Sequence, residues 1–206
     1  MWNYLATPWQ ICLEEAWRAR CEGSLPIGAA VVSGEGQVIA RGRNSTQSPS
    51  GQTLSHHRLA HAEMNALLAA DFSQHDPKAC TLYTSTEPCP LCVGAVVMAN
   101  VESLCYASRD PWCGSSELLT ANDYMRMKSV TAQAPQNGAL EFVLVVLQVD
   151  YHRSMGSQRA APLLAAWRQI VPQGVEVGLR MHAVIQDFVE RTQPVAKIVD
   201  RLAAEL

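Results

Sequence analysis

The sequence has 206 residues, of which 48% are apolar and 17% are charged, and its formal net charge is −3. A chain of this length and apolar content can bury a substantial core, which excludes an intrinsically disordered protein. The acidic balance and the lack of a long Lys or Arg run argue against a protein that binds nucleic acid through a basic stripe.

Two features bear on where the protein works. The first ten residues, MWNYLATPWQ, lack a basic segment followed by an apolar one, so we expect no secretory signal, and no apolar run approaches the roughly 18 residues of a membrane helix. Seven irregularly spaced cysteines are unlike the disulfide framework of a secreted protein. We therefore expect a soluble cytoplasmic protein.

The first predicted elements are a helix and a hairpin. Apolar residues recur at helical spacing from 8 to 22, after Pro8, which is typical of the first turn of a helix. The stretches PIGAAVV and QVIARGRN, separated by SGEG, predict two antiparallel strands. Residues 45–55 predict a polar loop.

Helices and strands alternate in the next part of the chain. AHAEMNALLAA predicts a helix, CTLYTS a strand, CVGAVVMAN a helix and SLCYAS a strand. This alternation implies parallel pairing, so we expect an α/β fold with a mixed sheet. After residue 113, KSVTAQAP and LEFVLVVLQV suggest two strands around PQNG, and residues 158–206 suggest helices broken near Pro172, Gly174 and Pro194.

The motif TEPCPLC, at 86–92, places Cys89 and Cys92 at the start of a predicted helix. By itself this C-x-x-C pair also fits a thioredoxin-like redox pair. His61 and Glu63, however, begin the preceding helix. One His and two Cys provide three zinc ligands and leave the fourth position open, which is the pattern of catalytic rather than structural zinc sites.

The H-x-E motif followed by P-C-x-x-C resembles the signature of the zinc-dependent cytidine/deoxycytidylate deaminase superfamily, over roughly residues 8–113. LYTSTEPCPLCVGAVVMANV is most similar to the guanine deaminase and tRNA adenosine deaminase branch, whereas HAEMNAL is equally similar to deoxycytidylate deaminases. The resemblance implies a three-layer α/β/α fold with a five-stranded mixed sheet. It also implies a zinc-dependent deaminase domain at 1–150, a C-terminal helical extension at 151–206 packed on the same domain, and a homodimer.

The resemblance also implies a reaction, the hydrolytic release of ammonia from a nucleobase, nucleoside or related aminated heterocycle of the guanine, cytosine or adenine type. Zn²⁺ would be held by His61, Cys89 and Cys92, and would activate a water molecule near neutral pH. Glu63 would move a proton from this water to a ring nitrogen and then to the departing amine.

Substrate binding is implied for Asn44, at the end of the second strand, for Ala62, and for Asp110, just past the fourth strand. Asn44 and Asp110 are also ordinary turn residues. The remaining His and Cys side chains have plainer interpretations: His56 and His57 as loop residues at the pocket mouth, Cys12, Cys21, Cys80 and Cys105 as core thiols, and Cys113 as a surface thiol or a substrate contact.

Two other functions fit the same motifs. One is editing of adenosine to inosine in tRNA, which would need a positive surface that the composition does not favour. The other is a catalytically inactive zinc-binding scaffold of the same fold.

Overall fold

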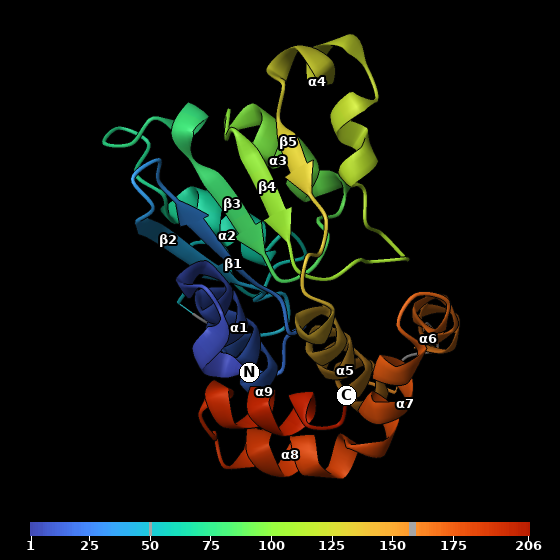
Figure 1. Ribbon diagram of the computed structural model, residues 1–206. Helices are drawn as coiled ribbons and strands as arrows, with labels where there is room; N and C mark the ends of the chain where they lie inside the picture. The colour runs from blue at the N-terminus through green and yellow to red at the C-terminus, as the bar shows by residue number, and fades with distance from the viewer. Residues whose placement is uncertain (50, 157–159) are drawn as a thin grey trace.

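The computed structural model describes residues 1–49, 51–156 and 160–206, and its centre is a five-stranded sheet (Figure 1). In spatial order the strands are β2 (Val38–Arg43), β1 (Gly28–Val32), β3 (Thr81–Thr84), β4 (Ser103–Tyr106) and β5 (Thr131–Gln133). β1 pairs antiparallel with both β2 and β3, while β3, β4 and β5 are parallel to one another. The predicted mixed sheet is confirmed.

Helices cover both faces of this sheet. α1 (Thr7–Cys21) packs on one face, and α2 (Ala62–Ala69) and α3 (Pro90–Met98) lie on the other. The alternation of side chains along β1 reflects this, because Ala30 joins α1 in one cluster while Ala29 and Val31 join α2 and α3 in another. Gly28 is required here, since a Cβ atom would lie 2.1 Å from the carbonyl oxygen of Cys12. The three-layer α/β/α arrangement is therefore confirmed.

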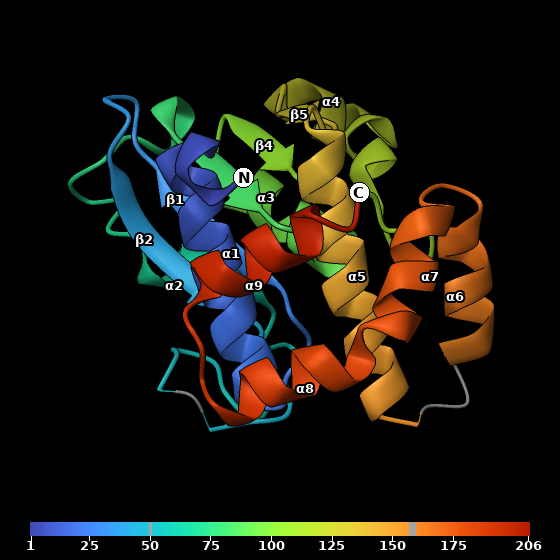
Figure 2. The ribbon, with the colours of Figure 1, turned by 60° about the horizontal axis from the view of Figure 1, so that its bottom comes forward.

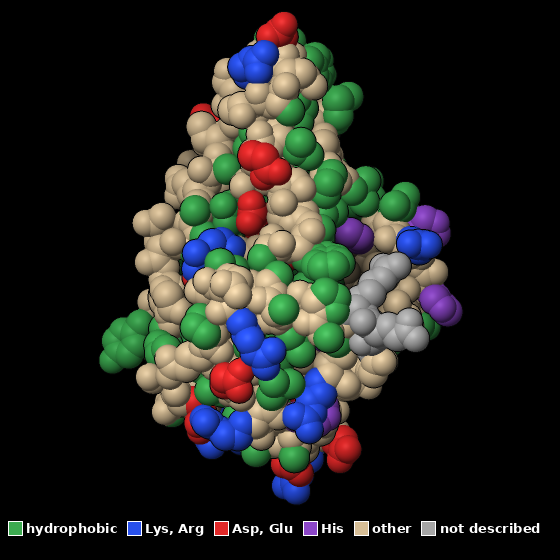
Figure 3. Space-filling view, turned by 90° about the vertical axis from the view of Figure 1, so that its right-hand side faces the viewer, with side chains coloured by type: hydrophobic (Ala, Val, Ile, Leu, Met, Phe, Trp, Pro, Cys, Tyr) green, Lys and Arg blue, Asp and Glu red, His purple; other side chains and the backbone are tan. Residues whose placement is uncertain are grey.

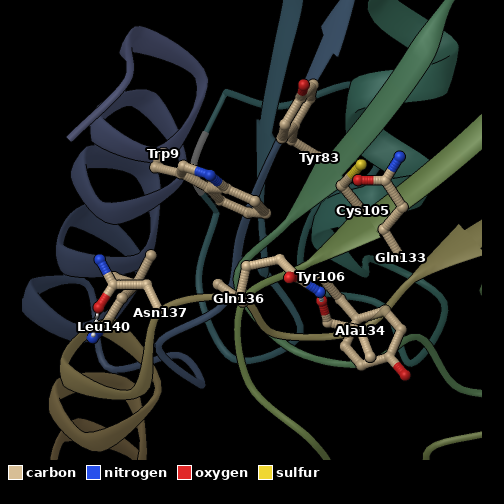
Figure 4. Close-up of a pocket in the computed structure, with 10 residues that line it drawn as sticks. Trp9, Tyr83, Cys105, Tyr106, Gln133, Ala134, Gln136, Asn137 and Leu140 are labelled. Carbon is tan, nitrogen blue, oxygen red and sulfur yellow. Dashed lines mark hydrogen bonds between the residues drawn. The ribbon is translucent and has the colours of Figure 1, made fainter.

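Part of the sheet face beside α1 is open. A cavity of about 160 Å³ lies there, with Trp9 of α1 on one side and Tyr83, Cys105 and Gln133 of the sheet on the other (Figure 4). The rings of Trp9 and Tyr83 meet edge to face, with centroids 4.9 Å apart. None of the predicted site residues is among the described residues that line this cavity.

The C-terminal half is mostly helical, and the helices near its end pack on α1. Its helices are α4 (Asp123–Lys128), α5 (Gly138–Ser154), α6 (Ala160–Arg168), α7 (Pro172–Arg180), α8 (His182–Glu190) and α9 (Val195–Ala203). The short 3₁₀ helices are Trp2–Tyr4, Pro77–Ala79 and Ser116–Thr120. Figure 2 shows α9 lying across α1 and α5. The core of this half joins Leu13 and Trp17 of α1 to α5, α7, α8 and α9. The division at residue 150 stays a prediction, and α5 runs through it.

One predicted strand is wrong. The stretch LEFVLVVLQV forms most of α5, not a strand. Asn137 begins this helix, because its side chain accepts hydrogen bonds from the backbone N–H groups of Ala139 and Leu140. α5 is buried almost all round by two clusters, so its sequence is apolar without a helical period, and such a run cannot be distinguished from a buried strand.

Gly174, which was predicted as a break, instead lies inside α7. A Cβ atom there would lie 3.1 Å from a methyl group of Val145, so this glycine lets α7 approach α5 closely. Within the described parts of the chain, the helices are too short or too polar to cross a membrane.

Candidate active site

Three potential metal ligands meet where α2 and α3 begin. His61 precedes α2, Cys89 precedes α3, and Cys92 lies in the first turn of α3. The Nδ1 atom of His61 is 3.5 Å from each sulfur, and the two sulfur atoms are 3.7 Å apart. With Zn–S bonds of about 2.3 Å and Zn–N bonds of about 2.0 Å, tetrahedral geometry places two sulfurs about 3.8 Å apart and nitrogen and sulfur about 3.5 Å apart. The arrangement therefore fits Zn²⁺.

The local sequence explains why these atoms converge. Pro90 in the first turn of α3 fixes the backbone that follows Cys89, and a spacing of three residues places Cys92 on the same side of the helix. Hydrogen bonding from the Cys92 thiol lowers the pKa of Cys89 to about 4, and the pKa of Cys92 is raised by that same bond and by burial. The pKa of His61 is raised, chiefly by its hydrogen bond with Cys89. Zinc would bind both thiolates and the neutral imidazole, so its binding would release protons.

Glu63 stands beside this cluster without being one of its three members. Its carboxylate is 4% exposed, with Oε2 3.4 Å from the Cys92 sulfur. The Oε1 atom accepts a hydrogen bond of 3.0 Å from the Thr84 hydroxyl at the end of β3. Burial raises the pKa of Glu63, because a charged carboxylate loses its hydration there. The group is thus held in one orientation and can carry a proton.

A cavity of about 220 Å³ leads to these side chains and also reaches Asn44. His61, Glu63 and Cys89 line it, together with Asn44 and Thr46. The Asn44 side chain is 3% exposed, and its Oδ1 accepts hydrogen bonds from the backbone N–H and hydroxyl of Thr46. These two bonds orient the amide, and no described residue accepts a hydrogen bond from its Nδ2, which can donate to a ligand in the cavity.

Asp110 lines the same cavity, in the loop after β4. Its Oδ1 accepts the backbone N–H groups of Trp112 and Cys113, and the Cys113 thiol donates to Oδ2 at 3.1 Å. The structure thus brings Asp110 to the cavity, while its carboxylate also holds the turn that follows it. Its predicted role in substrate binding stays a prediction.

Glu87 also lines this cavity, although the sequence analysis did not single it out. Its Oε1 accepts a hydrogen bond of 2.6 Å from the Ser116 hydroxyl, and its Oε2 accepts the backbone N–H of Asp110. Gly114 permits this approach, since a Cβ atom there would lie 2.6 Å from Oε2. A charged residue two positions before Cys89 was the available sequence signal.

The other predicted residues lie as follows. Ala62 is fully buried at the first position of α2, and its methyl group belongs to the core, so substrate contact there would involve backbone atoms and stays a prediction. His56 and His57 are exposed. Cys12, Cys80 and Cys105 are buried, Cys21 is half-buried and Cys113 is exposed.

Comparisons with known proteins agree with this site. Residues 6–108 match the model of the cytidine and deoxycytidylate deaminase zinc-binding region. A cytosine deaminase of Candida albicans is 29% identical over 55% of this chain and 72% of that protein. A tRNA-specific adenosine deaminase of Bacillus subtilis is 36% identical, over 52% of this chain and 63% of that protein. A guanine deaminase of Bacillus subtilis is also 36% identical, over 47% of this chain and 62% of that protein.

Solved structures share the fold. One, from a study of A-to-I editing by tRNA:A34 deaminases, has a TM-score of 0.56 at 25% identity and covers 66% of this chain and 96% of that chain. Another, solved in complex with 2,6-diaminopurine, has a TM-score of 0.51 at 29% identity and covers 71% of this chain and 82% of that chain. The His61, Cys89 and Cys92 cluster lies inside the matched region. The chain belongs to the zinc-dependent family of cytidine and deoxycytidylate deaminases.

Proposed function

We propose that this chain releases ammonia by hydrolysis from a nucleobase, a nucleoside or a related aminated heterocycle of the guanine, cytosine or adenine type. In this proposal His61, Cys89 and Cys92 hold the zinc ion, and Glu63 is the catalytic acid and base. The observation that carries it is the place of the Glu63 carboxylate, which is buried, oriented by Thr84, and next to the three ligands but outside their set. A purely structural zinc site has no use for such a group.

The geometry assigns different roles in the reaction to the zinc ion and to Glu63. Zinc, when bound, supplies a water molecule that ionises near neutral pH. Thr84 fixes Oε1 of Glu63, so Oε2 faces the cluster and accepts a proton there. Glu63 delivers this proton to the ring nitrogen next to the amine-bearing carbon. The water oxygen adds to that carbon. It then moves the remaining hydroxyl proton to the amine, so the C–N bond breaks and ammonia leaves.

The side chains that line the cavity would orient the substrate. The Nδ2 donor of Asn44 is available to a carbonyl or ring acceptor, and the carboxylates of Glu87 and Asp110 are available to ring N–H or amino groups. We keep Asn44, Ala62 and Asp110 as the proposed substrate-binding residues and add Glu87 to them.

Editing of adenosine in tRNA is the second candidate, because tRNA-specific adenosine deaminases are among the similar proteins. On the face that Figure 3 shows, however, Lys and Arg side chains stand among Asp and Glu side chains rather than forming a basic stripe. Tight, salt-sensitive tRNA binding and inosine formation would favour this candidate over a small substrate. A cytoplasmic location and a homodimer also stay predictions.

The test is ammonia release by the zinc-loaded protein with guanine, adenine, cytosine, their nucleosides and deoxycytidylate. We expect turnover with at least one of them, and its loss in Glu63→Gln with zinc content unchanged. Activity that survives in Glu63→Gln would contradict the proposed role of this residue. Bound zinc without turnover on this panel or on tRNA would support an inactive scaffold.

A further inference from the structure

A second cavity adjoins the one that contains Glu63. It has a volume of about 210 Å³, and both cavities are lined by Leu25, Asp110 and Cys113. The further walls of the second cavity come from the loop after β4 and from α5 and α6. These walls follow residue 108, where the family match ends.

The indole of Trp167 indicates that this second cavity takes a ligand. Trp167 lines the cavity and is 2% exposed, yet its Nε1 donor has no hydrogen-bond partner among the described residues. Buried donors are nearly always paired, so an unpaired one calls for an explanation. Trp17 shows the ordinary case, because its Nε1 donates to the backbone carbonyl of Gln193 at 2.8 Å. Because Nε1 itself is buried, an acceptor atom on a bound molecule would become its partner once the indole shifts toward the cavity.

Two more polar side chains line the same cavity, and both are uncharged. Gln148 is 3% exposed, and its Nε2 donates to the Thr86 hydroxyl at 2.8 Å, which leaves its Oε1 without a partner in the described parts of the chain. His152 lies against Trp167, with ring centroids 5.9 Å apart. Burial lowers the pKa of His152 although Asp110 opposes this, so the ring is neutral and offers one donor and one acceptor.

The rest of the lining sets the character of the ligand. Leu25, Leu163 and the ring of Trp112 are apolar walls, and Trp112 is 53% exposed at the surface. Among the described residues, neither cavity is lined by Lys or Arg, whereas Asp110 lines both. Against this described lining, a phosphate or carboxylate would meet a negative group without a compensating cation, while an uncharged ring would be well accommodated.

The geometry points to a subsite in which α5 and α6 bind an uncharged ring attached to the aminated heterocycle, with Trp167 donating to an acceptor on that ring. This inference rests on the proposed function, because it names a class of substrate for the same site. Two kinds of substrate carry such an uncharged ring: a nucleoside, whose ring is the ribose, and another heterocycle with a planar substituent. A bare nucleobase would leave the subsite empty, and a nucleotide would place its phosphate near Asp110.

The test measures binding rather than turnover. Calorimetry on the zinc-loaded Glu63→Gln protein would compare adenine, adenosine, adenosine monophosphate and 9-benzyladenine, and likewise cytosine and cytidine. We expect a ring-bearing probe to bind at least about tenfold more tightly than its bare base, because an additional ring is buried. Adenosine monophosphate should bind more weakly than adenosine. Adenosine and 9-benzyladenine distinguish the two sources.

Trp167→Phe, added to Glu63→Gln, tests the donor itself. It should reduce the preference for a ring with an acceptor by about two- to tenfold, the usual worth of one neutral hydrogen bond, and leave binding of the bare base unchanged. Phe removes the unpaired donor but also leaves space in the core around position 167, so thermal unfolding must show that the variant is folded at the temperature of the assay. Trp17→Phe is the matched control, because it loses a paired donor in the core and should leave the preference intact.

Equal binding of bare and ring-bearing probes would overturn the inference, as would a preference that Trp167→Phe leaves unchanged. Tighter binding of adenosine monophosphate than of adenosine would overturn it too. These outcomes differ from a failure of the proposed function. Wild-type protein that shows the preference but releases no ammonia would contradict the proposed function and leave the subsite standing.

Discussion

Asp150 is a fully buried carboxylate that ties together three helices, and replacing it tests whether the C-terminal helices fold as one unit with α1. Its Oδ2 accepts a hydrogen bond of 2.9 Å from Nε of Arg20 in α1. On its other side, Oδ1 lies 2.6 Å from Nδ1 of His182 and accepts a hydrogen bond of 3.0 Å from Gln186, both in α8. Asp150→Asn keeps the shape of the side chain and removes its charge.

The expected loss of stability in Asp150→Asn follows from the charged group that remains buried. Arg20 is 5% exposed, so the substitution leaves a buried guanidinium without its counter-charge, which costs about 3–5 kcal/mol. For a chain of this size each kcal/mol lowers the Tm by about 2–4 °C, so we expect a decrease of about 6–20 °C. Replacing both partners by apolar residues, Arg20→Met with Asp150→Leu, should recover much of the loss.

Thermal and urea unfolding, followed by circular dichroism, would measure this effect. The control is Asp187→Asn, whose carboxylate is 48% exposed and pairs with Arg191 at 2.8 Å along α8. An exposed pair of this kind contributes less than about 1 kcal/mol. Equal losses of stability in Asp150→Asn and Asp187→Asn would refute the argument, because they would show that the buried network does not hold the helices together.

Other predictions concern the zinc centre, the packing of α2 and the buried imidazole. Removing zinc with a chelator should lower the Tm by about 8–16 °C if zinc was present at 1,000 times its Kd, and Cys89→Ser should abolish this response. Gly42→Ala would place a Cβ atom 2.3 Å from a backbone nitrogen of α2, so we expect the free energy of unfolding to decrease by about 1–3 kcal/mol and zinc to be retained less well. The control is Gly94→Ala, which should be tolerated because the space around Gly94 is open. Because burial lowers the pKa of His152, the unfolded chain binds more protons as the pH falls below 6.5; the free energy of unfolding should therefore decrease there, and less so in His152→Gln.

Local patterns were sufficient for the sheet and for the metal cluster. The two strands around SGEG and the alternation that follows have clear periods and turn residues, and the structure has them as β1 to β4 with α2 and α3. His61, Cys89 and Cys92 could be predicted because each lies at the start of a helix, where a short motif fixes the direction of its side chain.

Sequence patterns were less informative where packing between distant segments decides the outcome. Glu15 lies in the polar stripe of α1, yet it is fully buried because Arg43 and Arg41 approach it from β2. The cavity under α6 is a similar case, since Gln148 and Trp167 lie far from the zinc motifs and have no motif of their own. Long-range contacts of this kind leave no periodic signal in the sequence.

The central claim is that three side chains of this protein hold zinc and leave one position open beside Glu63. X-ray absorption at the zinc edge, on protein loaded with one equivalent of zinc, tests it most directly. We predict two sulfur ligands at about 2.3 Å and two nitrogen or oxygen ligands at about 2.0–2.1 Å, one of them from solvent. In His61→Ala the imidazole contribution should disappear. A shell of three or four sulfur atoms, or a protein that does not retain zinc, would contradict the account.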